Sequence, residues 1–237
     1  MSESLRDILV GLWKRPTERD LQRLVGPSNI SNPCSRCLAE DMLQHEQPES
    51  QYTMGAKIGT AIHEALEREA LKRPDLTPET KVTIAEVEGY GVIKGTSDLY
   101  IKKLKTVADH KTSTIKKVEV YRTLKQLDRI NNVPEFEPES HTVGRKTIKR
   151  YKLQADIYGL GVENRGDEVK TVALNFIPRD AKTYNDLYVM EFDYDREAAL
   201  RAIERVRRLW SALQEGRDPS TIKSDPDCFV CNVLRKV

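Results

Sequence analysis

The 237-residue chain predicts an α/β fold in which a central mixed sheet is flanked by helices on both faces. Two observations carry this prediction. Short runs rich in β-branched residues alternate along the chain with longer segments whose apolar residues recur at helical spacing. The chain is also long enough to bury a substantial core, and 38% hydrophobic residues with a mean hydropathy of −0.59 are typical of one folded domain, or of one domain with an appendage.

Helices are expected where apolar residues recur with a period near 3.6. Residues 52–72 form the clearest one, with Ile58, Ile62 and Leu66 on one face and Arg73-Pro74 as its end. The other expected helices cover residues 5–13, 18–25 (ended by Gly26-Pro27-Ser28), 38–44, 115–128, 148–162 and 195–215.

Strands are expected before and after the helices over 115–162. A β-hairpin covers residues 81–101 and turns at Gly89-Tyr90-Gly91, and the next strand runs from about residue 106 to 111. Two further strands are expected over 169–178 and 187–192.

The proline-containing segment over residues 131–146, with Pro134, Pro138 and Gly144, is expected to be a mobile loop. The whole chain then divides into an N-terminal helical segment over 1–50, a core over 51–215 and a C-terminal tail over 216–237.

The net charge does not indicate whether the protein binds nucleic acid, but the hydropathy pattern bears on its location. With 39 basic and 37 acidic residues the formal net charge is +2, so the total charge argues neither for nor against nucleic acid. No apolar run approaches the roughly 18 residues of a membrane span, and the N-terminus does not resemble a signal peptide. We therefore expect a cytoplasmic protein, in a bacterial cell or a phage-infected host, with no membrane contact.

An acid–acid–base group lies on the two strands around residues 90–111. Side chains alternate faces along a strand, so Asp109 and Lys111 point to one side, with His110 opposite, and Asp98 lies on the preceding strand. Two carboxylates can hold a divalent cation, and a nearby lysine can position a water and offset phosphate charge. This chemistry is typical of metal-dependent phosphodiester hydrolysis; the alternative is solvated charges at strand ends.

The spacing of Asp98 and Asp109-x-Lys111 resembles the PD-(D/E)xK nuclease superfamily, whose core is the restriction-endonuclease-like fold. Ser97 stands where that family has proline, and the second acid is Asp rather than Glu. The resemblance implies that Asp98 and Asp109 bind Mg²⁺ or Mn²⁺, that the backbone carbonyl of His110 adds an oxygen ligand, and that Lys111 is the catalytic lysine.

Two helical motifs extend the resemblance to the RecB-like branch, with residues 51–215 as its nuclease core. Gly59-x-x-x-His63 matches the helical histidine of that branch and implies that His63 is a metal ligand. Gln154-x-x-x-Tyr158 matches its Q-x-x-x-Y motif and implies that both side chains belong to the catalytic site and contact the DNA strand. Alone, each motif has an ordinary structural alternative, a core or solvated helix residue; their joint order favours the nuclease. Glu86 and Glu88 are equally placed to add a further acid, and neither is favoured.

Four cysteines form two C-x-x-C pairs, Cys34 with Cys37 and Cys228 with Cys231. This placement predicts a metal site that joins the N- and C-terminal segments. It resembles the iron–sulfur members of the branch, the CRISPR-associated and phage exonucleases, and so implies a 4Fe–4S cluster. Those members have one cysteine upstream and three downstream, whereas here the division is two and two, so tetrahedral Zn²⁺ remains the alternative. Four unrelated thiols are the third interpretation.

The family resemblance implies a metal-dependent DNA exonuclease with little sequence preference, acting on single strands or strand ends. Arg145, Lys146, Lys149 and Arg150 are expected to contact phosphates. The expected protein partners are a second copy of the chain or recombination or CRISPR proteins. The alternatives are a non-catalytic DNA-binding or assembly subunit with the same fold, and a zinc-stabilised scaffold that binds no nucleic acid.

Overall fold

A computed structural model describes residues 24–43, 54–129 and 138–234 of the chain. The expected helix over 5–13 and nearly all of the one over 18–25 lie outside these residues.

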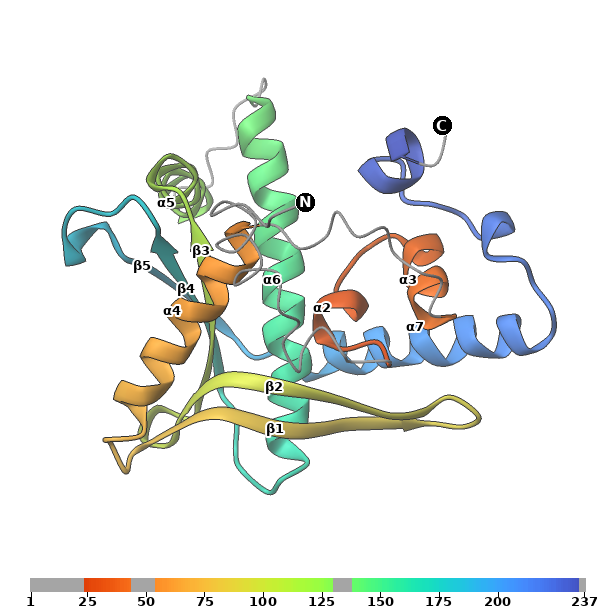
Figure 1. The fold of residues 1–237 in the computed structure, drawn as a ribbon, viewed down its shortest axis with the longest axis horizontal. Helices are drawn as coiled ribbons and strands as arrows, with labels where there is room; N and C mark the ends of the chain where they lie inside the picture. Colours follow the sequence, from red (N-terminus) through yellow and green to blue (C-terminus); the bar gives the residue numbers. More distant parts are fainter. Residues whose placement is uncertain (1–23, 44–53, 130–137, 235–237) are drawn as a thin grey trace, which may run out of the picture.

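The centre of the fold is a five-stranded mixed sheet, as the sequence predicts (Figure 1). Its strands lie in chain order: β1 (Leu76–Val87), β2 (Gly91–Ile101), β3 (Thr106–Ser113), β4 (Thr171–Pro178) and β5 (Tyr188–Asp193). Strands β3 and β4 are parallel, and the other neighbouring pairs are antiparallel. A parallel connection needs a long crossover, which the helices between β3 and β4 supply.

Strand β2 separates from β3 partway along its length. It pairs with β1 from Ile101 to Gly91, but with β3 only over Leu99–Ile101 and Thr106–Ala108. The rest of β2 continues with β1 as a long two-stranded hairpin that extends beyond the other strands (Figure 1). We call the point where β2 leaves β3, at Asp98 and Asp109, the fork.

Six α-helices surround the sheet in the part of the chain that the structure describes. They are α2 (Pro27–Ile30), α3 (Ser35–Met42), α4 (Met54–Ala70), α5 (Ile115–Arg129), α6 (Glu139–Glu163) and α7 (Arg196–Gln214). None of the helices in these described segments is long and apolar enough to cross a membrane.

Helices α4 and α6 lie on opposite faces of β3. Lys111 contacts Gln154 of α6, whereas a Cβ on Gly59 of α4 would lie 3.3 Å from Thr112 Oγ1. Adjacent residues of a strand point to opposite faces, so the two helices flank the strand from either side. This arrangement confirms the predicted sheet with helices on both faces.

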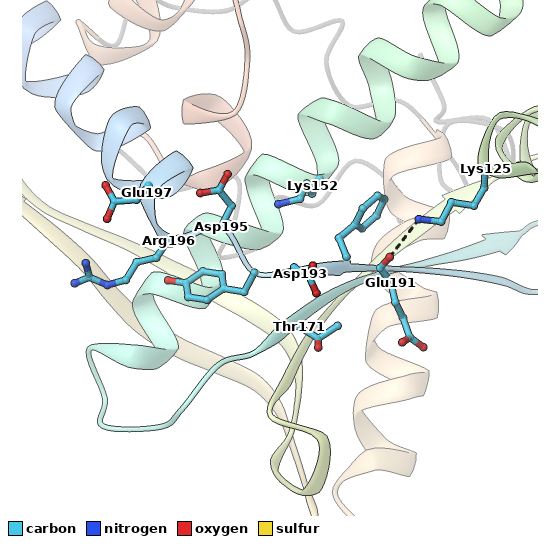
Figure 2. A pocket seen from close by; sticks show the side chains of 10 residues that line it. Lys125, Lys152, Thr171, Glu191, Asp193, Asp195, Arg196 and Glu197 are labelled. Carbon is cyan, nitrogen blue, oxygen red and sulfur yellow. Dashed lines mark hydrogen bonds between the residues drawn. The ribbon is translucent and has the colours of Figure 1, made fainter. Parts of the chain in front are cut away.

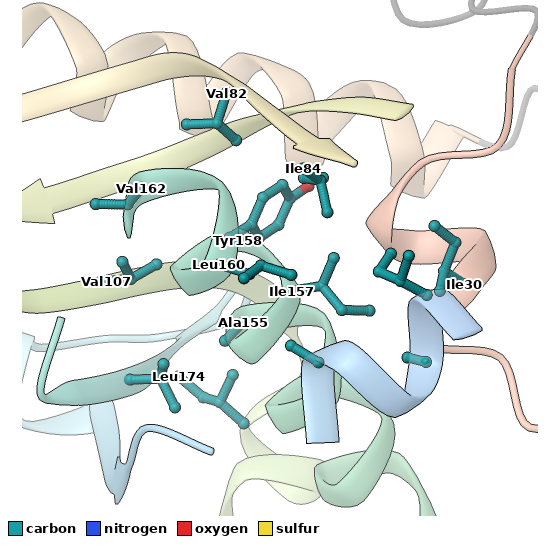
Figure 3. Close-up of a cluster of buried hydrophobic side chains, with 14 of the residues drawn as sticks. Ile30, Val82, Ile84, Val107, Ala155, Ile157, Tyr158, Leu160, Val162 and Leu174 are labelled. Carbon is teal, nitrogen blue, oxygen red and sulfur yellow. The ribbon is translucent and has the colours of Figure 1, made fainter. Parts of the chain in front are cut away.

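The main core lies between α6 and the sheet (Figure 3). Ile157 and Val162 of α6 are fully buried, together with Val107 and Leu174 from the strands. Residues 154–162 of α6 are buried without a break, so this half of the helix is removed from water on every side.

The expectation of a mobile loop over 131–146 is wrong for its second half. Pro138 is the N-cap of α6, and residues 139–146 are helical. Pro138 precedes the helix rather than interrupting it, and Gly144 is buried where α6 meets Leu124 of α5. Pro27 is also the first residue of a helix, α2, because proline suits a first helical turn. The helix that Gly26-Pro27-Ser28 was expected to end lies almost wholly outside the described residues.

Candidate active site and four-cysteine site

The predicted metal-binding residues converge at the fork. His63 comes from α4, Asp98 from β2, and Asp109 and Lys111 from β3. Because β2 and β3 stop pairing at this point, the backbone N–H of His110 is free to donate to the Asp98 carboxylate.

His63 and Asp98 form one half of this site. His63 Nδ1 lies 3.5 Å from Asp98 Oδ1, and the backbone N–H of His110 donates to Asp98 Oδ2 at 2.7 Å. Burial opposes the charged forms of both side chains, but their mutual attraction is stronger: the pKa of His63 is raised and the pKa of Asp98 is lowered. Without a cation the two side chains therefore form an ion pair, and His63 must lose its proton before it can bind a metal.

Asp109 and Lys111 form the other half. Asp109 is 1% exposed, and burial raises the pKa of its carboxyl to about 6 although Lys111 opposes the shift. Lys111 Nζ lies 2.6 Å from Asp109 Oδ2, an ion-pair distance, yet that buried oxygen accepts no bond with hydrogen-bond geometry. A carboxylate buried to this degree needs a positive charge beside it, which Lys111 supplies here.

Lys111 is fixed in place by helix α6. Its ammonium donates to Gln154 Oε1 at 3.1 Å and lies 4.7 Å from the centre of the Tyr151 ring. Gln154 thus orients the lysine from the helix, a role that the i, i+4 motif alone did not identify. Tyr151, which is half-buried, went unnoticed in the sequence because it lies outside that motif.

Tyr158 lies in the core instead of at an open surface. It is 4% exposed, and a Cβ on Gly95 would approach its ring to 2.9 Å. A base therefore has no free ring face to stack on in this conformation. The expected contact of Tyr158 with the DNA strand remains a prediction, and the aromatic ring beside Lys111 is that of Tyr151.

A third acid at the fork is Glu79, which the sequence analysis did not name. Its carboxylate, Asp98 and a ring nitrogen of His63 have ligand atoms within 4.8 Å of one another. Glu86 is exposed on the far part of β1, and Glu88 lies in the turn, so neither is the further acid of this group. The deciding signal is strand register, since Pro78 pairs with Leu99 and Thr80 with Ser97, which leaves Glu79 opposite Asp98.

His110 contributes its backbone more than its ring to the site. Its imidazole stands edge-on to that of His63, with ring centres 5.7 Å apart, and its Nδ1 lies 3.2 Å from Asn175 Nδ2. Burial lowers the pKa of His110, which favours the neutral ring. That the His110 carbonyl is a ligand of the divalent metal remains a prediction.

The four basic residues expected at phosphates all lie on helix α6. Arg145 pairs with Asp128 of α5, Lys146 lies 2.5 Å from Asp227, and Arg150 donates to the Ser28 carbonyl. Lys149 is exposed. Contact of these side chains with DNA remains a prediction, and for three of them the structure records contacts within the chain.

The two cysteine pairs come together, as their spacing predicts. Cys37 Sγ lies 3.4 Å from Cys228 Sγ and 3.5 Å from Cys231 Sγ, and Cys34 Sγ lies 3.7 Å from Cys231 Sγ. Thiolates bound at about 2.3 Å to one tetrahedral ion lie roughly 3.8 Å apart. These separations fit a single tetrahedral ion, whereas a 4Fe–4S cluster places four metals between its thiolates and needs more room.

Protonation in the cysteine site is uneven. Burial opposes ionisation of Cys34, but the N–H groups of Cys37 and Asp225 lower the pKa of its thiol to about 7. Burial raises the pKa of Cys231 to about 11 and also raises that of Cys37. Cys34 is thus the thiol most ready to bind a metal at neutral pH.

Arginines fasten the cysteine site to the rest of the fold. Arg205 of α7 donates to the carbonyls of Ile30, Asn32 and Pro33, just before Cys34. Arg36 donates to the carbonyl of Ile222 in the tail. We call α2, α3 and the tail over residues 219–234 the cysteine lobe.

A cavity of about 830 Å³ lies elsewhere, along β5 and the start of α7 (Figure 2). Acidic and basic side chains line it in similar numbers, with Lys125 and Lys152 on one side and Glu191, Asp195 and Glu197 among the acids. None of the residues predicted for hydrolysis lines this cavity, so the site at the fork follows from the geometry of its ligands instead of from the size of a pocket.

Three solved structures are similar to this chain. The structure of SSO0001 has a TM-score of 0.54 at 17% identity, covering 99% of this chain and 98% of that one. A phage-related exonuclease from Haemophilus somnus 129PT has a TM-score of 0.47 at 13% identity, covering 91% and 90%. The alkaline exonuclease LHK-Exo from Laribacter hongkongensis has a TM-score of 0.44 at 10% identity, covering 81% and 89%. No family model and no curated protein matches the sequence. The likeness to SSO0001 shows a shared fold.

Proposed function

We propose that this chain is a divalent-metal-dependent nuclease that hydrolyses phosphodiester bonds in DNA. The observation that carries the proposal is the convergence at the fork of His63, Asp98, Asp109 and Lys111 from three separate elements. A bound Mg²⁺ or Mn²⁺ would supply Lewis-acid activation of the phosphate and of the attacking water.

The protein's own groups have separate roles in this proposal. His63 and Asp98 hold the cation from one side of the fork, and Asp109 presents a buried oxygen from the other. Lys111, oriented by Gln154, offsets charge on the scissile phosphate and positions the water that attacks it.

Exonuclease action with little sequence preference is the finer part of the proposal. Exonuclease action rests on the family resemblance alone. The low sequence preference is supported by the basic residues of α6, the helix that also carries Gln154: Arg145, Lys146, Lys149 and Arg150. Contacts of this type bind phosphates and carry no base information. Single strands or strand ends are the proposed substrate.

A metal at the four cysteines completes the proposal. The resemblance favours a 4Fe–4S cluster, whereas the sulfur separations favour one Zn²⁺ ion. In either case the metal acts on folding, because it ties residues 34–37 to the end of the chain, far from the fork.

The test is replacement of Lys111 by alanine. We expect Lys111→Ala to lower the rate of degradation of end-labelled DNA with Mn²⁺ by at least about a hundredfold. Binding of DNA and the circular dichroism spectrum should stay unchanged. Lys117→Ala, an exposed lysine at the start of α5, is the matched control and should keep full activity.

Substantial cleavage by Lys111→Ala would overturn the assignment of the lysine. If the wild-type chain binds DNA but cleaves none with Mg²⁺ or Mn²⁺, the protein is a binding or assembly subunit with this fold. If it binds no DNA, the scaffold interpretation replaces the nuclease.

A further inference from the structure

We propose that Glu79 is a ligand of the divalent cation at the fork, together with His63 and Asp98. The ligand set then comes from α4, β1 and β2. This inference rests on the proposed function, which makes the fork a metal site, and it adds a residue that binds the metal there.

The geometry adds Glu79 to the ligands that the sequence predicts. His63, Glu79 and Asp98 have ligand atoms within 4.8 Å of one another, and Asp109 is not part of this group. The Asp109 carboxylate lies against Lys111 instead. An imidazole nitrogen with two carboxylates is a common donor set for Mn²⁺ and similar ions.

The backbone at Glu79 gives independent support. Glu79 has φ of 39°, in the left-handed region that side chains other than glycine rarely adopt. The β1–β2 ladder omits it, with pairs on either side at Pro78–Leu99 and Thr80–Ser97. A strained residue of this kind persists when surrounding structure holds it, and such residues gather at functional sites.

Electrostatics also calls for a cation at this point. Glu79 and Asp98 have carboxylate oxygens within 4.8 Å of each other, and two carboxylates this close repel when both are charged. A divalent ion between them would turn this repulsion into attraction.

The residues on the two sides of the fork then have different roles. The hairpin β1–β2 and α4 supply Glu79, Asp98 and His63 to the ion, whereas β3 supplies Asp109 on the other side and Lys111 for the attacking water and the phosphate. Loss of Glu79 should therefore weaken metal affinity.

The experiment measures Mn²⁺ binding by the full-length chain, with free Mn²⁺ followed by electron paramagnetic resonance in the absence of DNA. We expect Glu79→Gln to raise the Kd at least about tenfold. Glu86→Gln, on the same strand but exposed and remote from the fork, is the matched control and should stay within twofold of wild type.

Glu79→Gly covers the case in which Glu79→Gln does not fold, because glycine adopts positive φ without strain. A Kd within twofold of wild type in a folded Glu79 variant overturns the inference. The two proposals fail separately: a wild-type chain that binds Mn²⁺ through Glu79 but cleaves no DNA overturns the nuclease alone. A chain that cleaves DNA with Glu79-independent Mn²⁺ affinity overturns only the inference, and a chain that binds no Mn²⁺ overturns both.

Discussion

At the scale of single residues, the fork shows charged groups held in an environment that disfavours them. Asp109 is almost fully buried and its pKa is raised to about 6, while Asp98 nearby keeps a lowered pKa through its pairing with His63. Groups with pKa values displaced in this way are typical of functional sites. Such groups are retained at a cost in folding free energy.

This cost predicts how Asp109→Asn changes stability with pH in the absence of added divalent ions. Because the folded carboxyl has a pKa of about 6 and the unfolded one about 3.9, the folded state binds more protons in this interval. The contribution of Asp109 to the free energy of unfolding therefore falls as pH rises from about 4 to about 6. We expect Asp109→Asn to gain stability relative to wild type across that window.

Urea unfolding of both proteins at two pH values measures this difference. The first, pH 4.5, is about half a unit above the unfolded pKa, and the second, pH 8, is about two units above the folded one. The advantage of the variant should be larger at the higher pH. Asp193→Asn, an exposed acid of β5, is the control and should show no such trend. An advantage that shrinks as pH rises would contradict the prediction.

At the scale of elements, α6 is the helix on which the fold and the site both depend. It contacts four of the five strands and carries Gln154. Its close approach to β1 depends on Gly161, where a Cβ would lie 2.5 Å from Val82 Cγ2 and 2.8 Å from Val82 Cβ. Val82 is branched at Cβ and anchored in a strand, so it cannot move aside as a flexible side chain would.

We therefore expect Gly161→Ala to lower the free energy of unfolding by about 1–3 kcal/mol, because the clash outweighs the gain of about 1 kcal/mol from alanine in a helix. The comparison is Gly144→Ala in the same helix, where a Cβ would meet the end of the Leu124 side chain at 2.8 Å. That end can turn away, so the second variant should be the more stable. Urea denaturation measures the free energy of unfolding of both variants. A Gly161→Ala protein more stable than the Gly144→Ala protein would show that the packing of α6 does not depend on Gly161.

At the scale of the whole molecule, the cysteine lobe joins the two ends of the described chain. Cys34 and Cys231 are 197 residues apart in sequence, and Arg205 ties the segment before Cys34 to α7. A metal at the four sulfurs closes a loop that contains nearly all of the fold. Closure of so long a loop reduces the entropy of the unfolded chain.

Removal of one ligand should loosen the lobe more than the sheet. We expect Cys37→Ser to lower Tm by several degrees and to remove hydrogen-exchange protection from α3, while β3 stays protected. Ser35→Ala, between the two cysteines of the same pair, is the control. Equal loss of protection in α3 and β3 would show that lobe and sheet unfold as one unit.

The metal content and colour of the purified protein identify the metal at the four cysteines. Zinc at about one ion per chain in a colourless protein supports the single tetrahedral ion. Iron and inorganic sulfide in a brown protein support the cluster that the resemblance implies. Neither result changes the proposal for the fork, since the two sites share no ligand.

The local sequence alone determined most helix and strand positions, the face that Asp109 and Lys111 share, and the meeting of the four cysteines. The periods of apolar residues placed the helices and strands, and strand alternation put Asp109 and Lys111 on one face. Two C-x-x-C pairs at opposite ends of the core predicted that four sulfurs meet, which the structure confirms. These features follow from spacing within one element or from ligand chemistry, so they can be predicted without knowledge of how elements pack.

The tertiary structure decided the features that depend on distant residues. The register of β1 against β2 placed Glu79, not Glu86, beside Asp98. Packing of α6 on the sheet buried Tyr158 and left Tyr151 beside Lys111. Register and burial are set by contacts between segments far apart in the chain, and no local pattern of polar and apolar residues contains that information.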